Sequence, residues 1–411
     1  MVINPEAGKD SARLGRNVNR RVPGRDSASL VSNHPRVTEL VKKLVGEQGE
    51  VLINMFQTIP EMTLGLLPGA RIIGPDAQLA NRWNSKIHTY RSMDGVVPIP
   101  EFRVCFNRDE LIQTTRELWS KWLHGIFLSL EYSAAGAFSF RSRSEGELLD
   151  RLGDWRPPYL ITRFIPHLYD PTVLAVVANE NDVYVAGIAD QQMADVNKFT
   201  GSLFPSVLPP DLLDKLKGLT ATVGRALGRT GYRGIFGCDY IVDDGGDPFF
   251  VEVNARKQGT TMEMCCHLEN SLPEGCANLL ELELLAVTDG KFPENTRELP
   301  VNPGNVHWGT YNFKVERDVI VGKALPSPPD ERALFREAHR SHGAEARHIV
   351  VEHVGADFVV GKGSFLGRVV SIGNCREDVV KGLEQGKNTL AQTLEKESEN
   401  GVRATTAQSA G

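Results

Sequence analysis

The side chains with the clearest chemical potential lie close together in the segment 237–259. Its sequence, GCDYIVDDGGDPFFVEVNARKQG, contains two runs of apolar and aromatic β-formers joined by Asp-Gly-Gly-Asp, a pattern typical of a β-hairpin. If the two glycines form a two-residue loop, Asp239 lies opposite Glu252. The period of two then places Asn254 on the same face as Glu252. The sequence therefore predicts two carboxylates and an amide at one point.

Two carboxylates at directly opposite positions favour a bound cation. Like charges placed there repel, by about 4 kcal/mol at about 4 Å and an effective dielectric of about 20. A divalent cation between the two carboxylates would turn this repulsion into a net attraction. Mg²⁺ prefers hard oxygen ligands and often completes its coordination shell with phosphate oxygens. Arg256 follows in step and offers a guanidinium suited to a phosphoryl group. The alternative is an acidic hairpin that meets water, but Glu252 and Asn254 interrupt an otherwise apolar strand, which favours the metal.

The arrangement closely resembles the metal-binding hairpin of ATP-grasp ligases, an Asp or Glu followed on the next strand by Glu-x-Asn-x-Arg. That family couples ATP cleavage to the joining of a carboxylate and a nucleophile, usually an amine, through an acyl-phosphate. The resemblance implies that Asp239, Glu252 and Asn254 bind one or two Mg²⁺ ions, with Mn²⁺ as a substitute. It also implies that Arg256 is a catalytic residue that stabilises the transition state.

The same resemblance implies further ATP-binding residues. Lys86 follows a Gly-x-Asp turn and a short helical segment, where family members place a phosphate-binding lysine; on local grounds alone, a lysine at a helix start is usually solvated. The loop YSAAGAF matches the lid over the phosphates, because small residues let backbone amides approach anionic oxygen. Its candidate ligands are Ser133, Ala134, Ala135 and Gly136.

The sequence departs from the family pattern on the strand before this loop. Many members carry a second lysine there, whereas this chain reads FLSLEY, with Ser129 or Glu131 near that position. Lys198, in the segment ADQQMADVNKFTG, is predicted as a catalytic residue that supplies the missing positive charge. A surface lysine in a polar loop is an equally weighted alternative.

The hinge departs from the pattern as well. The sequence YLITRFIP replaces the usual glutamate pair, so adenine is expected to contact backbone groups of Arg163, Phe164 and Ile165 and a hydrophobic wall. Gln191 matches a region that faces ribose, phosphate or substrate in the family.

Composition and charge narrow the class of protein. The 411 residues are 41% hydrophobic and 24% charged, with a net charge of −6, as in an ordinary globular chain with no reason to bind nucleic acid. No apolar run is long enough to span a bilayer. The six cysteines show no CxxC spacing and the N-terminus resembles no secretory signal, which predicts reduced thiols in a cytoplasmic protein. Cys265, Cys266 and His267 are adjacent in an expected helix, so they cannot all face one metal ion.

One local exception to this charge balance is the arginine-rich stretch 13–25. It could be a nucleic-acid arm, but it lacks interleaved aromatic residues. A solvated segment is the favoured interpretation. A third alternative is a segment that folds towards the active site to meet a carboxylate-rich substrate.

The pattern of strands and helices predicts an α/β protein with α+β lobes, and the resemblance implies the ATP-grasp fold. Alternating helix and strand signals indicate a pre-ATP-grasp α/β domain over 1–84. The small lid subdomain is expected over 85–162 and the large subdomain with the hairpin over 163–298. The Pro- and Asn-rich stretch PENTRELPVNPGN precedes a small C-terminal α+β domain over 299–400, and the polar tail 401–411 predicts disorder.

Within the superfamily, the layout is most similar to peptide ligases of the pheganomycin type. The resemblance rests on GPDAQLANRWNSK, FLSLEYSAAGAF and GKGSFLGRVVSIGNCREDVVKGL. It implies a peptide or amino-acid ligase of antibiotic biosynthesis that joins a small-molecule carboxylate to an amine or peptide. It also implies a homodimer formed through the N-terminal domain, with neither nucleic acid nor membrane as a partner.

Two alternatives stay open. A biotin-carboxylase-like enzyme would share the hairpin and Arg256, but the following Lys257-Gln258-Gly259-Thr260-Thr261 lacks the acid that would activate bicarbonate. The other alternative is a nucleotide-binding module that lost turnover together with the second lysine.

Overall fold

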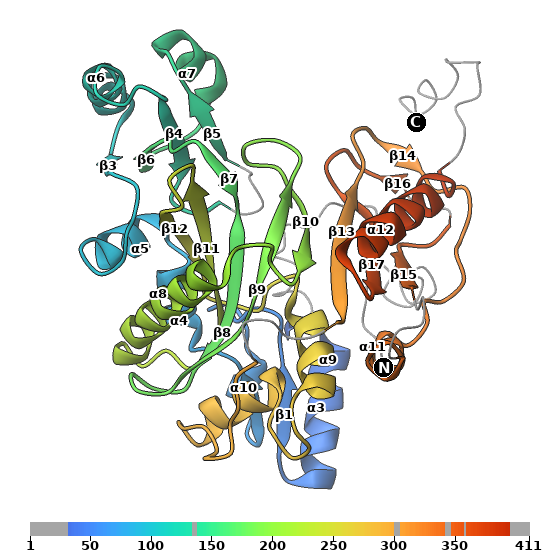
Figure 1. The fold of residues 1–411 in the computed structure, drawn as a ribbon. Coiled ribbons are helices and arrows are strands. Elements are labelled where there is room, and N and C mark those ends of the chain that lie inside the picture. The colour runs from blue at the N-terminus through green and yellow to red at the C-terminus, as the bar shows by residue number, and fades with distance from the viewer. Residues whose placement is uncertain (1–31, 134–137, 300–304, 342–346, 357–358, 395–411) are drawn as a thin grey trace, which may run out of the picture.

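The computed structural model describes residues 32–133, 138–299, 305–341, 347–356 and 359–394 (Figure 1). The lid residues Ala134, Ala135 and Gly136, the arginine-rich stretch 13–25 and the tail 401–411 lie outside these ranges.

The first described unit alternates helix and strand, as the sequence predicted. Its elements are α3 (Pro35–Gln48), β1 (Val51–Asn54), η1 (Leu64–Leu66), β2 (Ala70–Ile73), α4 (Ala77–Trp83) and α5 (Lys86–Met93). β1 and β2 form a parallel pair, and Val37, Val41 and Leu64 are buried against them. Among the described residues, this parallel sheet has only two strands.

The lid unit is a four-stranded antiparallel sheet in the order β3-β6-β4-β5, backed by two helices (Figure 1). Its elements are β3 (Phe102–Cys105), α6 (Arg108–Trp119), β4 (Ile126–Leu130), β5 (Ser139–Ser142), α7 (Glu145–Leu152) and β6 (Tyr159–Arg163). The Ser144 side chain accepts a hydrogen bond from the Glu147 amide and caps α7.

The largest sheet of the described chain has nine strands, in the order β12-β11-β8-β9-β10-β13-β17-β15, with β7 paired to β11. Its strands are β7 (His167–Tyr169), β8 (Pro171–Val177), β9 (Val183–Met193), β10 (Phe199–Phe204), β11 (Gly234–Asp243), β12 (Pro248–Asn254), β13 (His307–Lys314), β15 (His348–His353) and β17 (Phe365–Gly373). A separate short pair joins β14 (Val319–Ile320) to β16 (Val359–Val360). The packed helices are α8 (Pro210–Arg229), α9 (Thr261–Ser271), α10 (Leu279–Thr288), α11 (Glu331–Arg340) and α12 (Arg376–Ala391).

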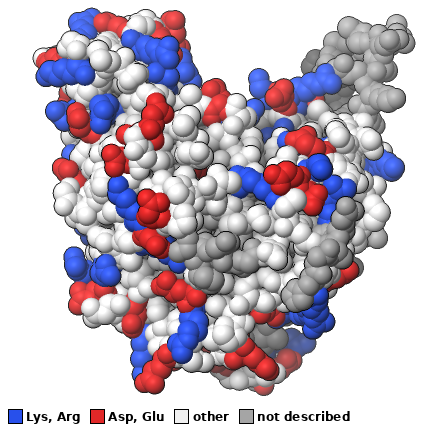
Figure 2. Space-filling model, viewed as in Figure 1, with Lys and Arg blue, Asp and Glu red and all other residues white. Residues whose placement is uncertain are grey.

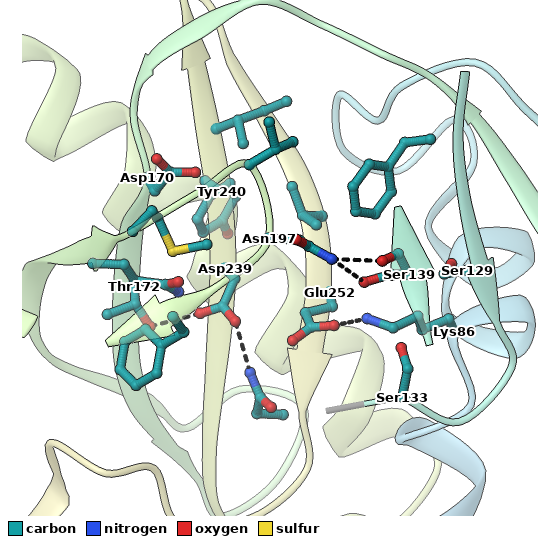
Figure 3. A pocket seen from close by; sticks show the side chains of 18 of the residues that line it. Lys86, Ser129, Ser133, Ser139, Asp170, Thr172, Asn197, Asp239, Tyr240 and Glu252 are labelled. Atoms are coloured by element: carbon teal, nitrogen blue, oxygen red, sulfur yellow. Dashed lines mark hydrogen bonds and ion pairs between the residues drawn. The ribbon is translucent and has the colours of Figure 1, made fainter. Parts of the chain in front are cut away.

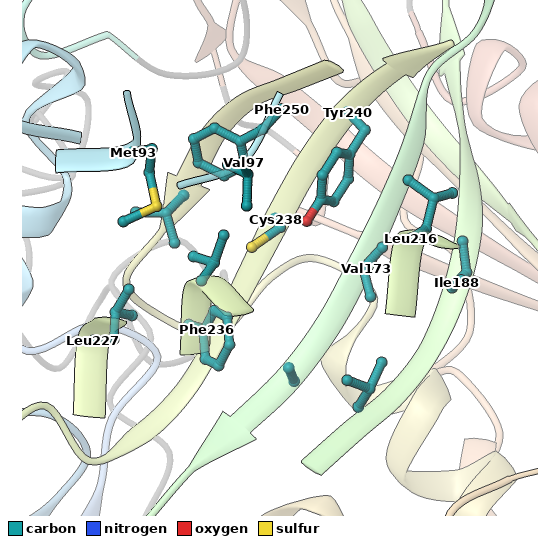
Figure 4. Close-up of a cluster of buried hydrophobic side chains, with 14 of the residues drawn as sticks. Met93, Val97, Val173, Ile188, Leu216, Leu227, Phe236, Cys238, Tyr240 and Phe250 are labelled. Carbon is teal, nitrogen blue, oxygen red and sulfur yellow. The ribbon is translucent and has the colours of Figure 1, made fainter. Parts of the chain in front are cut away.

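Both faces of this sheet are covered, and β8 shows why. Its sequence PTVLAVV is apolar almost throughout, and every residue of the strand is buried. Because successive side chains point to opposite faces, Val173 belongs to the cluster beneath α8 and Leu174 to the cluster beneath α9 and α10. Figure 4 shows the α8 side, where Leu216 lies near Val173 of β8 and Ile188 of β9.

The C-terminal strands continue this sheet. β13 pairs with β10, and β17 and β15 extend the same ladder beyond it. The segment predicted as a separate domain over 299–400 therefore shares a sheet with the preceding unit, and the division of the chain into domains remains a prediction.

Within the described residues, no helix is both long and apolar enough to cross a bilayer. Acidic and basic side chains are interspersed over the face drawn in Figure 2.

Candidate active site

The predicted hairpin is formed by β11 and β12, and Asp239 lies opposite Glu252 as predicted. The predicted two-residue loop is wrong. The pair Val242–Pro248 and the bond from the Asp243 amide to the Asp247 carbonyl leave a three-residue loop, as in hairpins that carry glycine at positive φ. Gly246 has φ of 81°.

A bulge in β12 restores the predicted pairing. The register shifts between Asp239 and Tyr240, so that Tyr240 pairs with Phe250 and Val251 is the extra residue. Phe250 and Val253 are both in the buried cluster beneath α8, although a regular strand would place them on opposite faces. The bulge therefore turns Glu252 away from that core and towards the cavity.

Asp239 is held by three donors at the floor of the site. Its carboxylate accepts hydrogen bonds from Thr172 Oγ1 at 2.7 Å, Asn254 Nδ2 at 2.9 Å and Gln258 Nε2 at 3.5 Å. Burial raises the pKa of Asp239, and it outweighs the hydrogen bonds and the charges of Lys86 and Arg256 that act in the other direction. A buried carboxylate of this kind favours a nearby cation.

Lys86 and Glu252 form an ion pair (Figure 3). Lys86 is the first residue of α5, which Ser85 caps by accepting the His88 amide at 3.1 Å. Glu131, after β4, fixes this helix start, because it accepts the Ser85 hydroxyl at 2.6 Å and, through its carbonyl, the Lys86 amide at 3.0 Å. Burial lowers the pKa of Lys86 to about 8, partly offset by Asp239.

Arg256 lies beside Asn254, and its charge acts on the Asp239 carboxylate. Its Nη2 donates to Asn254 Oδ1 at 2.8 Å and its Nη1 to the Lys257 carbonyl at 3.2 Å. Its guanidinium carbon lies 6.0 Å from the centre of the Phe56 ring. Burial lowers the pKa of Arg256, although Asp239 acts against this. The guanidinium remains charged, because its ordinary pKa is far above neutrality.

The residues fit a Mg²⁺ ion. No group of three or more His, Cys, Asp or Glu within the described ranges could hold a metal, but Mg²⁺ is often held by one or two carboxylates together with substrate phosphates. Asp239 and Glu252 point into the same space in Figure 3. A half-turn of the Asn254 amide would replace the nitrogen now facing Asp239 with an oxygen.

Two residues of the following loop support this geometry, and the sequence interpretation did not assign them that role. Lys257 is buried; its ammonium group forms an ion pair with Glu283 Oε2 at 2.6 Å and donates to the Met55 carbonyl at 2.8 Å. Gln258 lies against Gly237, where a Cβ would come within 2.1 Å of Gln258 Cδ. The loop after Arg256 is thus fixed both to the residue that follows β1 and to the hairpin.

The site opens into a cavity of about 640 Å³ between the lid sheet and the large sheet. Most of the predicted residues line it: Lys86, Ser133, Arg163, Phe164, Ile165, Gln191, Asp239, Glu252, Asn254 and Arg256. Lys198 is not among the lining residues; its side chain is half exposed and its ammonium lies 3.8 Å from Glu316. A catalytic role for Lys198 remains a prediction that this geometry does not favour.

Two of the three predicted hinge amides already donate hydrogen bonds within the protein. The Arg163 amide donates to the Glu101 carbonyl and the Phe164 amide to the Gly125 carbonyl. The Arg141 guanidinium lies 3.8 Å from the centre of the Phe164 ring and fixes that side chain. Among the described residues, the Ile165 amide has no such acceptor.

The cavity also contains residues that were not predicted. They are Asn312 and Lys314 of β13, Phe365 of β17, and His167, Asp170 and Thr172 near β8. The alternation in YNFK is the one sequence signal that places Asn312 and Lys314 on a common face.

Comparison with known proteins gives a fold. No protein-family model matches the sequence, and no curated protein sequence matches it. The biotin carboxylase domain of the 2-oxoglutarate carboxylase of Hydrogenobacter thermophilus, with MgADP, ADP and bicarbonate, superposes with a TM-score of 0.61 at 16% identity, over 87% of this chain and 77% of that one.

Two other structures are similar. The N5-carboxyaminoimidazole ribonucleotide synthetase of Thermotoga maritima gives a TM-score of 0.56 at 15% identity, over 87% of this chain and 84% of that one. The Aspergillus clavatus N5-carboxyaminoimidazole synthase, with ADP and 5-aminoimidazole ribonucleotide, gives 0.55 at 13%, over 78% and 77%. The chain has the ATP-grasp fold that the sequence predicted.

Proposed function

We propose that this protein is an ATP-dependent carboxylate–amine ligase that forms an amide through an acyl-phosphate and releases ADP and phosphate. The observation that carries the proposal is the convergence of Lys86, Asp239, Glu252, Asn254 and Arg256 on one cavity. Solved structures of similar fold contain MgADP or ATP, which supports ATP and Mg²⁺ as the bound species here.

The cavity contains groups that could bind each part of ATP. Phe127 and Leu160 of the lid sheet and Ile241 of β11 provide apolar walls for adenine. The Ile165 amide can donate to a ring nitrogen at the hinge. Lys86 can serve the phosphates only after it leaves Glu252.

The proposed chemistry has two steps. A carboxylate oxygen of the acid attacks the γ-phosphorus while the bond to ADP breaks; an amine nitrogen then attacks the acyl carbon, phosphate leaves and the amine loses a proton. Asp239, Glu252 and Asn254 would hold Mg²⁺, which neutralises charge between β- and γ-oxygens when bound. Arg256 is placed to stabilise the oxyanions of both steps.

A carboxylase is the second candidate, because the 2-oxoglutarate carboxylase structure contains bicarbonate. The loop after Arg256 contributes Thr260 to the cavity rather than an acid. The first acid of α9 is Glu263, which is fully buried, paired with Arg368 and absent from the cavity lining. No carboxylate of this loop is therefore available to activate bicarbonate.

The narrower assignment is a peptide or amino-acid ligase of antibiotic biosynthesis, of the pheganomycin type. Its support is the resemblance in sequence layout, and dimerisation through residues 1–84 belongs to the same proposal. All six cysteines are free thiols, which supports a reducing, cytoplasmic location.

The test is an ADP-release assay with candidate acids and amines. We expect turnover that requires both a carboxylate and an amine, with one amide formed per ADP. Turnover that requires bicarbonate would favour the carboxylase. Tight ATP binding without turnover for any acid would favour the non-catalytic nucleotide-binding module.

A further inference from the structure

The cavity has a second positively charged region, remote in the sheet from the metal-binding residues. Lys314 is the last residue of β13 and lines the cavity together with Asn312. The two residues share a face of the strand because side chains alternate. β8, β9 and β10 separate β13 from β11, the strand that carries Asp239.

Lys314 has a positive neighbour instead of an acidic partner. Lys198 directly precedes β10, the strand that pairs with β13. Burial, together with the charge of Lys198, lowers the pKa of Lys314. No carboxylate of the described chain lies within ion-pair distance of Lys314; Glu316 pairs with Lys198 but is 90% exposed.

An aromatic ring lies beside this ammonium group, and further apolar side chains line the cavity. Phe365 is the cross-strand partner of Lys314, and its ring centre lies 5.1 Å from the Lys314 ammonium nitrogen. Met193 and Phe199 pair across β9 and β10 and line the cavity as well. A cation beside an apolar wall matches a ligand with an anionic group next to a hydrophobic body.

We propose that Lys314, together with Asn312, binds the free carboxylate of the amine substrate, which is not the carboxylate that is activated, and that Phe365, Met193 and Phe199 hold an apolar side chain beside it. The inference rests on the proposed function, because it takes the cavity to hold this amine substrate together with ATP. The substrate class is an amphipathic carboxylate, such as an apolar amino acid or a short peptide with an apolar C-terminal residue. Lys314 is thus a specificity-determining residue.

A nucleotide phosphate could also place an anionic oxygen on Lys314. Direct binding measurements distinguish the substrate carboxylate from the nucleotide phosphate. The probes are N-acetylated amino acids from alanine to phenylalanine, each as the free acid and as the carboxamide. Calorimetry measures their binding to the full chain saturated with Mg²⁺ and a non-hydrolysable ATP analogue. The analogue itself is titrated separately. The variants are Lys314→Met, Lys314→Arg and, as a control on the surface, Lys215→Met, which removes an exposed pair with Asp247.

We expect acids to bind about tenfold or more tightly than their carboxamides, the size of one charge-assisted hydrogen bond, and larger apolar side chains to strengthen binding. Lys314→Met should abolish the preference for the acid, Lys314→Arg should largely keep it, and Lys215→Met should not change it. All variants should bind the ATP analogue equally.

Equal binding of acids and carboxamides to the wild-type protein, or a preference that survives in Lys314→Met, would overturn the subsite. So would a loss of affinity for the ATP analogue in Lys314→Met, which would assign the lysine to phosphate. Failure of the wild-type protein to bind the ATP analogue would instead contradict the proposed function, so the two failures are distinguishable.

Discussion

Lys86, at the start of α5, is paired with Glu252, on strand β12. Lys86, which is predicted to bind phosphate, is thus paired with Glu252, which is predicted to bind the metal. The ion pair neutralises the charge of Glu252 beside Asp239. Burial already disfavours the charged form of the Asp239 carboxylate. Entry of Mg²⁺ with ATP would free Lys86 for the phosphates and supply Glu252 with a new cation.

Glu252→Gln should severely reduce ADP formation while the fold is retained. The amide is isosteric with the carboxylate but lacks the charge that a hard cation requires. We expect a loss of about a hundredfold or more in kcat/KM, the size seen when one electrostatic contact to a transition state is removed. Steady-state ADP release measures it, with Asp244→Asn in the hairpin turn as the control. Undiminished activity of Glu252→Gln would refute the metal assignment.

Arg256→Lys should be nearly as severe. The guanidinium contacts Asn254 and the Lys257 carbonyl through two different nitrogens, and an ammonium group cannot reproduce that planar fork. The expected result is a fall in kcat of about a hundredfold. Arg229→Lys, on the exposed end of α8, provides the matched substitution. If Arg256→Lys kept the wild-type kcat, Arg256 would have no role in the transition state.

Gly237→Ala should damage the site through packing. The added Cβ would lie 2.1 Å from Gln258 Cδ, so Gln258 must move and lose its contacts with Thr172 and Asp239. We expect a lower free energy of unfolding, by about 1–3 kcal/mol, and a large loss of activity. Gly218→Ala is the control, because its Cβ meets nothing within 4 Å. Wild-type activity of Gly237→Ala would show that Gln258 does not position Asp239.

Acid destabilisation should depend on His267. Burial, followed by the charges of His339 and His307, lowers the pKa of His267 to about 3, against about 6.5 in an unfolded chain. Between these pH values the His267 imidazole is protonated in the unfolded state and neutral in the folded state. The contribution of His267 to the free energy of unfolding is therefore fully present above pH about 6.5. It falls towards pH about 3, by up to about 1.4 kcal/mol per pH unit.

Denaturant unfolding as a function of pH tests this contribution. His267→Gln should flatten the acid limb of the stability curve, whereas His124→Gln, at an exposed position of the lid, should leave its slope unchanged. Equal slopes in both variants would show that His267 does not titrate on unfolding.

The sequence was informative where contacts are local. The hairpin residues Asp239 and Glu252 could be paired from turn chemistry and alternation, because few residues separate the two strands. Even there, the pairing depended on a longer loop and a bulge at Val251 that offset each other. The bulge follows from the packing of Phe250 and Val253 in one core, which local patterns do not reveal.

Non-local contacts were the part that could not be predicted. Lys314 reaches the cavity because β13 pairs with β10, more than a hundred residues earlier in the chain. For the same reason, Lys198 was expected in the cavity, whereas its strand end places it beside Glu316. The predicted C-terminal domain is likewise joined to the large sheet by pairing that no local pattern indicates.

The most direct test of the central claim is a crystal structure of the protein with Mg²⁺ and a non-hydrolysable ATP analogue. We predict a metal ion about 2.1 Å from oxygens of Asp239, Glu252 and Asn254, with the Lys86 ammonium group moved from Glu252 to a phosphate. A nucleotide bound elsewhere, or a Lys86–Glu252 pair that persists beside a bound nucleotide, would contradict the account.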